Sequence, residues 1–136
     1  MKVVIDSNVF VSCMATASSY HIIFQKLTEG AYQICITTDI ALEYLEVFQT
    51  KFSTTKADNL FRYLSESPFV IVTAVYFKWN LIEADKDDNK FVDCAIAAAA
   101  NFIVSNDRHF NVLERQDFPK VTFITIDQFA AMLQSM

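Results

Sequence analysis

Five short apolar runs rich in β-branched residues are spaced along the chain, and each is typical of a strand buried on both faces of a sheet. They cover residues 3–5, 32–37, 69–75, 102–105 and 121–126. Between them, apolar residues recur at helical spacing over 8–13, 19–29, 39–51, 55–66, 89–101 and 128–134, with a short turn near 108–114. This alternation predicts an α/β fold with a mostly parallel five-stranded sheet and helices on both faces.

Neither a repeat nor a linker interrupts the pattern, so we expect residues 1–136 to form a single domain. No apolar run approaches the roughly 18 residues of a membrane span, and the N-terminal run ends at Asp6, too early for a signal peptide. The cysteines, Cys13, Cys35 and Cys94, are odd in number and set among apolar neighbours. They indicate buried free thiols in a reducing cytoplasm, and we expect a cytoplasmic protein with no membrane segment.

The composition of the chain excludes several classes of function. Gly30 is the only glycine of the chain, and it is placed to end the helix over 19–29. A chain with a single glycine has neither a Walker loop nor a GxGxxG dinucleotide turn. The net charge is -5, from 11 basic and 16 acidic residues. Without a strongly basic stripe, any contact with nucleic acid is expected to be local rather than broad.

Four carboxylates fall where the expected topology brings segments together. Asp6 ends the first strand in VVIDSNVF, and Asp107 follows the strand FIVS. Glu43 and Asp93 lie early in the helices over 39–51 and 89–101. The carboxyl ends of parallel strands and the starts of the neighbouring helices share one edge of the sheet, where ligands bind. We therefore expect the four side chains to meet.

Each acid also has a simpler interpretation. Asp6 and Asp107 are suited to cap a following helix or turn, and Glu43 to be a solvated helix residue. Asp93 is harder to explain, because its apolar neighbours make an unpaired charge costly. Clustered carboxylates repel one another unless cations bind, and oxygen donors without histidine favour Mg²⁺ or Mn²⁺ over zinc. Such a site promotes displacement at phosphorus.

Four segments together resemble the PIN-domain ribonucleases, and more closely the toxins of type II toxin–antitoxin modules. The segments are VVIDSNVF, ITTDIALEYLEV, DDNKFVDCAIAAA and FIVSND, in that order along the chain. The resemblance implies a metal-dependent endoribonuclease. In such an enzyme, Asp6, Glu43, Asp93 and Asp107 would hold Mg²⁺ or Mn²⁺, and the bound ion would activate water for attack on the RNA phosphodiester.

The resemblance also implies supporting residues. Asn8 and, less strongly, Ser105 would orient Asp6 or a water. Asp88 is suited either to cap the helix over 89–101 or to support the mouth of the metal site. Lys90 and Arg108 flank the site and would meet substrate phosphate, if they are not simply solvated charges.

Two further polar residues, His109 and Asn106, lie close to Asp107 along the chain. His109 is expected to be a surface residue rather than a general base. Asn106 stands where related sequences often have glycine, and asparagine tolerates left-handed backbone angles better than most residues.

The resemblance further implies a homodimer and a cognate antitoxin that blocks the active site. Aromatic residues near Phe77 and Trp79, or along the two helices over 39–66, are candidates for such an apolar contact patch. A catalytically inactive PIN-fold module that binds RNA or protein is the alternative function. A phospho-acceptor domain is disfavoured, because Asp6 lacks an acidic neighbour, and an aspartate phosphatase because DSN lacks a second aspartate two residues on.

Overall fold

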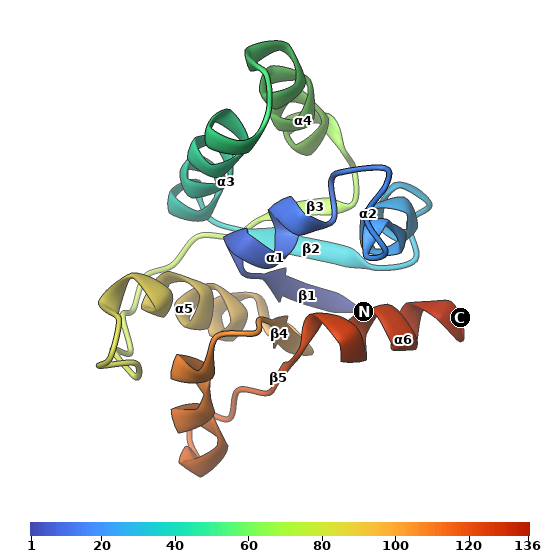
Figure 1. Cartoon of the computed structure of the whole chain (residues 1–136). Helices are drawn as coiled ribbons and strands as arrows, with labels where there is room; N and C mark the ends of the chain where they lie inside the picture. Colours follow the sequence, from blue (N-terminus) through green and yellow to red (C-terminus); the bar gives the residue numbers. More distant parts are fainter.

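A five-stranded sheet lies at the centre of the protein in the computed structural model, which describes residues 1–136 (Figure 1). The strands run in the order β3-β2-β1-β4-β5, and every neighbouring pair is parallel. Their bounds are Lys2–Ile5 (β1), Gln33–Ile36 (β2), Val70–Val72 (β3), Phe102–Val104 (β4) and Phe123–Ile124 (β5). The predicted α/β fold is confirmed, with a sheet that is entirely parallel.

Six α-helices and two short 3₁₀ helices connect and cover the strands. They are α1 (Ser7–Ser12), α2 (His21–Thr28), α3 (Thr38–Lys51), α4 (Thr54–Glu66), η1 (Lys86–Asp88), α5 (Asn89–Ala98), η2 (Arg108–Arg115) and α6 (Ile126–Gln134). Gly30 follows α2 with φ of 77°, in the region that disfavours other residues. A Cβ atom there would lie 2.7 Å from the Phe69 ring, so Gly30 ends α2 as the sequence predicts.

The expected boundaries differ from the structure mainly at the edge strands. The runs over 69–75 and 121–126 shorten to β3 and β5, because each edge strand has only one neighbour with which to pair. In addition, α6 begins at Ile126, two residues before the expected start. The reason is a capping box, in which Thr125 and Gln128 bond each other's backbone N–H groups.

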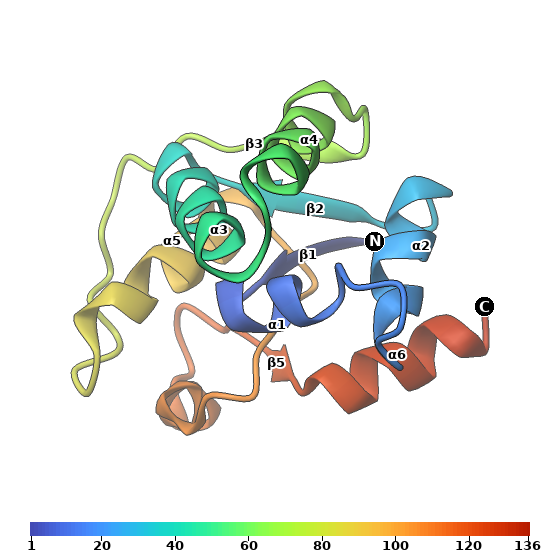
Figure 2. The ribbon, with the colours of Figure 1, turned by 45° about the horizontal axis from the view of Figure 1, so that its top comes forward.

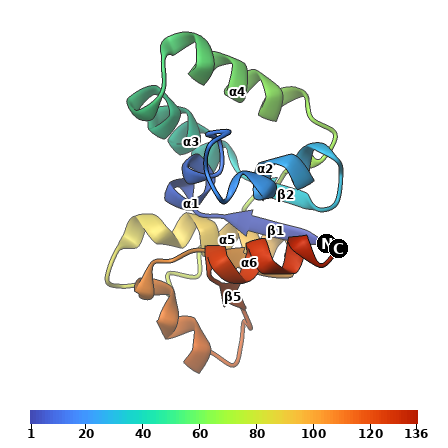
Figure 3. The same ribbon diagram turned by 45° about the vertical axis from the view of Figure 1, so that its right-hand side comes forward.

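The order of the strands determines where the helices lie. The chain runs outward from β1 to β2 and β3, then crosses back to β4 on the other side of β1. Right-handed crossovers therefore place α5 on the face opposite to α1 and α2 (Figure 2). The C-terminal helix α6 packs against α2 (Figure 3). No helix is both long enough and apolar enough to cross a bilayer.

The strand order reverses at β1, because β2 and β3 are added on one side of it and β4 and β5 on the other. Ligands of open α/β sheets bind at the carboxyl ends of the strands where the order reverses. Asp6 directly follows β1 at this position, and Ser105 directly follows β4. Both chain termini lie at the other end of the strands, on the right in Figure 1.

The two aromatic groups singled out in the sequence have different surroundings. Along α3 and α4, Phe48 is buried against the rings of Phe10 and Tyr44, whereas Phe52, Phe61 and Tyr63 are half-buried. Phe77 keeps 63% of its surface exposed and its ring contacts that of Trp79. The second group therefore offers the larger exposed apolar surface.

Candidate active site

Asp6 stands between the ends of β1 and β4. Its backbone N–H donates to the Val104 carbonyl at 3.0 Å, which continues the pairing of the two strands by one residue. Its carboxylate accepts the Asn8 N–H at 3.1 Å on Oδ1 and the Ser105 hydroxyl at 2.8 Å on Oδ2. Asp6 therefore does cap α1, as the simpler interpretation proposed, yet its side chain still faces a cavity.

Burial is the main reason that the pKa of Asp6 is raised above its ordinary value of 3.8. The hydrogen bonds from Ser105 and Asn8 oppose the shift, because they stabilise the carboxylate. The negative charges of Glu43 and Asp107 add to it. These two residues are thus close enough to Asp6 for their charges to act on it.

Glu43 reaches the site from α3, where its neighbour Tyr44 anchors the helix. Tyr44 is fully buried and its hydroxyl donates to the carbonyl of Ile5, the last residue of β1. One Glu43 oxygen accepts a hydrogen bond from the Ser7 hydroxyl, and the other lies 2.8 Å from the Lys90 ammonium. Glu43 is therefore partnered on both oxygens rather than solvated.

Asp107 follows β4 and begins η2. Its Oδ1 accepts the His109 N–H at 2.9 Å, so it caps this helix, and its own N–H donates to Ser105 Oγ at 3.0 Å. Asn106, just before it, does not have the positive φ that would replace a glycine. Instead, its side-chain oxygen accepts the Ile126 N–H at 3.0 Å and ties this turn to the start of α6.

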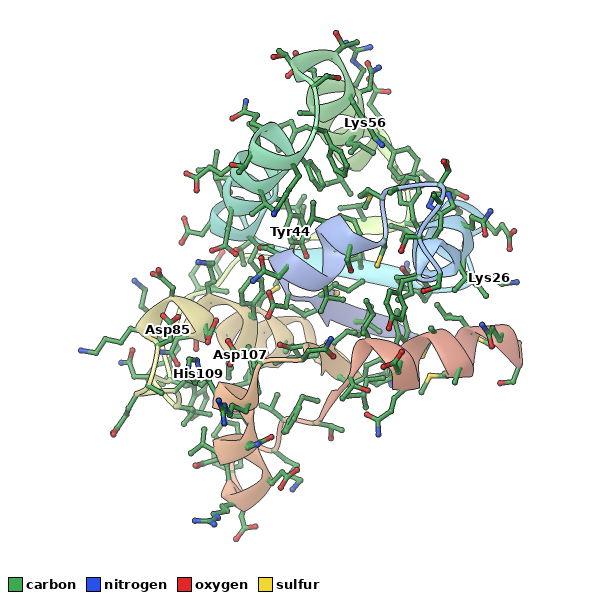
Figure 4. All side chains as sticks on the ribbon, viewed as in Figure 1. Lys26, Tyr44, Lys56, Asp85, Asp107 and His109 are labelled. Atoms are coloured by element: carbon green, nitrogen blue, oxygen red, sulfur yellow. The ribbon has the colours of Figure 1, made fainter.

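His109 and Asp88 form a contact that the sequence analysis missed. Nδ1 of His109 lies 3.2 Å from both Asp88 Oδ2 and Asp107 Oδ1, so the imidazole joins the two carboxylates. Asp88 makes no capping hydrogen bond to α5. Figure 4 shows His109 beside Asp107 and Asp85 on the same side of the molecule. The signal available in the sequence was the position of His109, two residues after Asp107.

The carboxyl group of Asp88 has the most strongly shifted pKa of the site. It is 8% exposed, and burial raises its pKa to about 6. The hydrogen bond with His109 lowers the pKa, whereas the charges of Asp107, Asp85 and Asp6 raise it. The buried side chain of Asn89, the first residue of α5, ties the start of this helix to Ile82 through hydrogen bonds of 2.8 and 2.9 Å to the Ile82 backbone.

Asp93 lies apart from these acids. Its Oδ1 accepts the Trp79 N–H at 3.0 Å, and the charge that acts on it most is that of Lys78. Desolvation is the main cause of its raised pKa, and neither Asp6, Glu43 nor Asp107 contributes. By contrast, Ser105 contacts both Asp6 and Asp107, and His109 contacts both Asp107 and Asp88. The charge of Glu43 acts on Asp6, so these four residues, Asp6, Glu43, Asp88 and Asp107, form the acid cluster. Asp93 lies on the side of α5 that faces the segment after β3.

The remaining expected residues have clear positions. Asn8 contacts Asp6 through its backbone N–H, and its side chain is exposed. Lys90 pairs with Glu43, whereas Arg108 is exposed and forms no ion pair.

The donor set fits a divalent cation. Asp85, Asp88 and His109 each offer a ligand atom within 4.8 Å of the others, and Asp107 Oδ1 lies 3.2 Å from Nδ1 of His109. The charge of Asp6 acts on Asp88. Raised pKa values at Asp6 and Asp88 show that the site resists negative charge, which a cation would relieve. Carboxylate oxygens suit Mg²⁺ and Mn²⁺, and an imidazole nitrogen favours the transition metal of the two.

Two cavities flank the acid cluster. One, of about 430 Å³, is lined by Asp6, Asp107, Asn8 and Ser12 among others. The second, of about 590 Å³, is lined by Lys90, Asp93 and residues that follow β2 and β3. The smaller cavity therefore adjoins Asp6 and Asp107, and the larger one adjoins Glu43 through its partner Lys90.

Comparison with solved structures identifies the same fold elsewhere. A PilT N-terminus domain protein from the hyperthermophilic archaeon Sulfolobus solfataricus P2 is 18% identical, with a TM-score of 0.60 over 100% of this chain and 96% of that chain. The structure of VapBC2 from Rickettsia felis, bound to a DNA fragment from their promoter, is 17% identical with a TM-score of 0.61. That match covers 92% of this chain and 98% of the other.

At the level of sequence, no curated protein matches the chain. A family model that describes the PIN domain does match, over residues 2–109. This range contains all four segments on which the resemblance depends, and it includes both Asp88 and His109. The match covers well over half of the chain, which therefore belongs to the PIN-domain family.

Proposed function

We propose that the protein is a divalent-cation-dependent endoribonuclease that hydrolyses RNA phosphodiester bonds as the toxin of a toxin–antitoxin pair. PIN domains are generally nucleases. The observation that carries the proposal is the convergence of Asp6, Glu43, Asp88 and Asp107 at the carboxyl edge of the sheet. Two of these acids have raised pKa values, which is typical of functional sites.

In this proposal, Asp6, Asp88 and Asp107 hold the cation, and the Glu43 carboxylate, whose charge acts on Asp6, adds to the negative potential that attracts it. When bound, Mg²⁺ or Mn²⁺ would supply Lewis-acid chemistry, lowering the pKa of water and offsetting charge on the phosphate. Ser105 and the Asn8 N–H orient Asp6 through the hydrogen bonds described above. The imidazole of His109 contacts both Asp88 and Asp107 and so links these two carboxylates.

Asp93, which the family resemblance proposes as a ligand, differs from Asp88 in what it contacts. Asp88 is within electrostatic reach of Asp6 and Asp107, whereas Asp93 is engaged by the Trp79 N–H. We therefore propose Asp88 as the fourth acid and assign Asp93 to the wall of the adjacent cavity. Substituting each residue separately distinguishes the two assignments.

The test is cleavage of a labelled structured RNA pool in Mg²⁺, Mn²⁺ or EDTA, with fragment ends mapped. We expect cuts that need the cation and that fall by at least about 100-fold in Asp6→Asn and Asp88→Asn. Asp58→Asn, an exposed change on α4, is the matched control and should cleave normally. Full activity in Asp6→Asn would sink the proposal.

Equal losses in Asp93→Asn and Asp88→Asn, with the fold retained, would return Asp93 to the ligand set. RNA binding without cleavage under any condition, by protein shown to be folded and free of a partner, would favour the inactive binding module instead.

A protein partner and self-association belong to the same proposal. The structural neighbour described as VapBC2 supports a cognate antitoxin, and Phe77 and Phe118 offer exposed apolar surface for contacts. We propose a homodimer that acts in the cytoplasm, where the three buried cysteines stay as free thiols. Light scattering of the purified chain tests the dimer, which a monomeric mass at micromolar concentration would contradict.

A further inference from the structure

The larger cavity beside the acid cluster has no role in the proposed chemistry. Its volume of about 590 Å³ falls within the usual range of small-molecule pockets and is ample for one nucleotide. It lies between the start of α3, the extended segment after β3 and the first turns of α5. The charged residues that line it are Lys78, Lys86, Lys90, Asp39, Asp87 and Asp93.

Two of the three lysines that line this cavity form no ion pair. Lys90 pairs with Glu43, but neither Lys78 nor Lys86 has a carboxylate within ion-pair distance. In a chain with a net charge of -5, two unpaired lysines in one cavity are suited to phosphate contacts. Both side chains are exposed, so they can reach a ligand without leaving a protein partner.

The acids show that the cavity does not simply attract anions. Asp93 is only 6% exposed, and its Oδ1 accepts the Trp79 N–H. Its Oδ2 accepts no hydrogen bond from the protein and is open to solvent on the side of the cavity. Carboxylate oxygens accept hydrogen bonds from the N–H groups of nucleobases. Lysines and carboxylates in one cavity therefore fit a ligand that has a phosphate at one end and N–H donors at the other.

The cavity adjoins the acid cluster through Lys90, whose ammonium lies 2.8 Å from Glu43. Tyr76 and Phe77 are 96% and 63% exposed, between Val75 and Lys78, both of which line the cavity. Exposed aromatic rings beside cationic side chains stack on unpaired bases. Paired bases in a duplex cannot enter such a pocket singly.

We propose that this cavity binds one nucleotide of single-stranded RNA, next to the phosphodiester at the acid cluster. The neighbouring position of that bond rests on the proposed nuclease function, whereas the binding itself does not. Lys78 and Lys86 contact the phosphates, Asp93 Oδ2 accepts from the base, and the Tyr76 ring stacks on the next base.

Trp79, the only tryptophan of the chain, lies between the lining residues Lys78 and Asn80 and reports binding directly. The probe is a mixed-sequence, 2′-O-methylated single-stranded RNA, titrated in EDTA so that no cleavage occurs. We expect a saturable change in Trp79 emission. The double variant Lys78→Gln/Lys86→Gln should bind at least about tenfold more weakly, with its salt dependence reduced by about two ions.

The matched control is Lys26→Gln/Lys51→Gln, which removes the same charge elsewhere. Lys26 lies on α2, and Lys51 lies at the end of α3 away from the cavity, roughly 20 Å along the helix. The proposal is overturned if wild type does not bind, if the control weakens binding as much, or if the RNA duplex binds as tightly. Binding through Lys78 and Lys86 without cleavage of unmodified RNA would refute the nuclease function alone. Cation-dependent cleavage with unchanged binding by the cavity variant would refute the cavity proposal alone.

Discussion

The Ser105 hydroxyl donates a hydrogen bond of 2.8 Å to Oδ2 of Asp6, and both residues directly follow neighbouring parallel strands. Ser105 is 1% exposed, so its hydroxyl has little access to water, and its oxygen also accepts the Asp107 N–H. One buried side chain thus positions two of the proposed ligands.

Replacing Ser105 with alanine is expected to weaken the binding of Mn²⁺ by roughly tenfold while the fold persists. The hydrogen bond from Ser105 stabilises the Asp6 carboxylate, so its loss raises the pKa of Asp6 further. Calorimetric titration with Mn²⁺ measures the effect. Ser65→Ala, which removes a hydroxyl bonded only within α4, is the control. Equal affinities in the two variants would contradict the role of Ser105.

Lys90→Gln is expected to tighten the binding of Mn²⁺ by roughly three- to tenfold, because the ammonium paired with Glu43 repels an entering cation. The same variant should be slightly less stable without metal, since the carboxylates lose a neutralising charge. Calorimetry and thermal unfolding measure both effects, with Lys51→Gln as the control. Weaker cation binding in Lys90→Gln would show that Glu43 needs its lysine partner to hold its position.

The stability of the metal-free protein is expected to fall as the pH rises from about 4 to about 6. Because the pKa of Asp88 rises from 3.8 to about 6 on folding, the folded state binds more protons than the unfolded state in this window. Asp88→Asn removes this contribution and should stabilise the metal-free protein at pH 7.5 by roughly 1–2 kcal/mol. Near pH 4 the variant and wild type should be similar.

Urea unfolding at pH 4.5 and pH 7.5 tests this expectation, and Asp58→Asn should leave the pH profile unchanged. Added Mn²⁺ should stabilise wild type at pH 7.5 and much less at pH 4.5, where protons compete for the carboxylates. A variant Asp88→Asn that is less stable than wild type at pH 7.5 would show that the charge of Asp88 stabilises the fold.

The thiols should be inert in the folded protein. All three cysteines are buried, and burial raises the pKa of Cys13 and of Cys94 to about 12. At pH 8 the thiolate fraction of such a group is about a thousandfold below that of a thiol with the ordinary value. Disulfide reagents should therefore detect the thiols only after unfolding. Rapid labelling of the native state would indicate that the core around Cys13 or Cys94 opens frequently.

The alternation of strands and helices was predictable from the sequence, because each element depends on residues only a few positions apart. The burial of Val3, Val4 and Ile5 follows from an apolar run that stops at a carboxylate. The proximity of Asp6, Glu43 and Asp107 also followed from topology, because parallel strands bring these positions to one edge.

Asp88 and Asp93 could not be told apart in this way. Both lie in or next to the first turns of α5 and both are buried, and the apolar residues around Asp93 made it the stronger candidate in the sequence. What separates them is contact with distant segments: His109 meets Asp88, and the backbone of Trp79 meets Asp93. The electrostatic environment of Asp88 likewise requires Asp6 and Asp107, which come from other strands.

Local pattern thus determines the elements, their order and the edge at which polar side chains gather, because backbone preference and hydrophobic periodicity act over short stretches. The choice of partner for each carboxylate arises from contacts between residues as far apart as Asp6 and Ser105, ninety-nine positions along the chain. Such contacts exist only once the whole sheet has formed, and they decide which acids can share a cation.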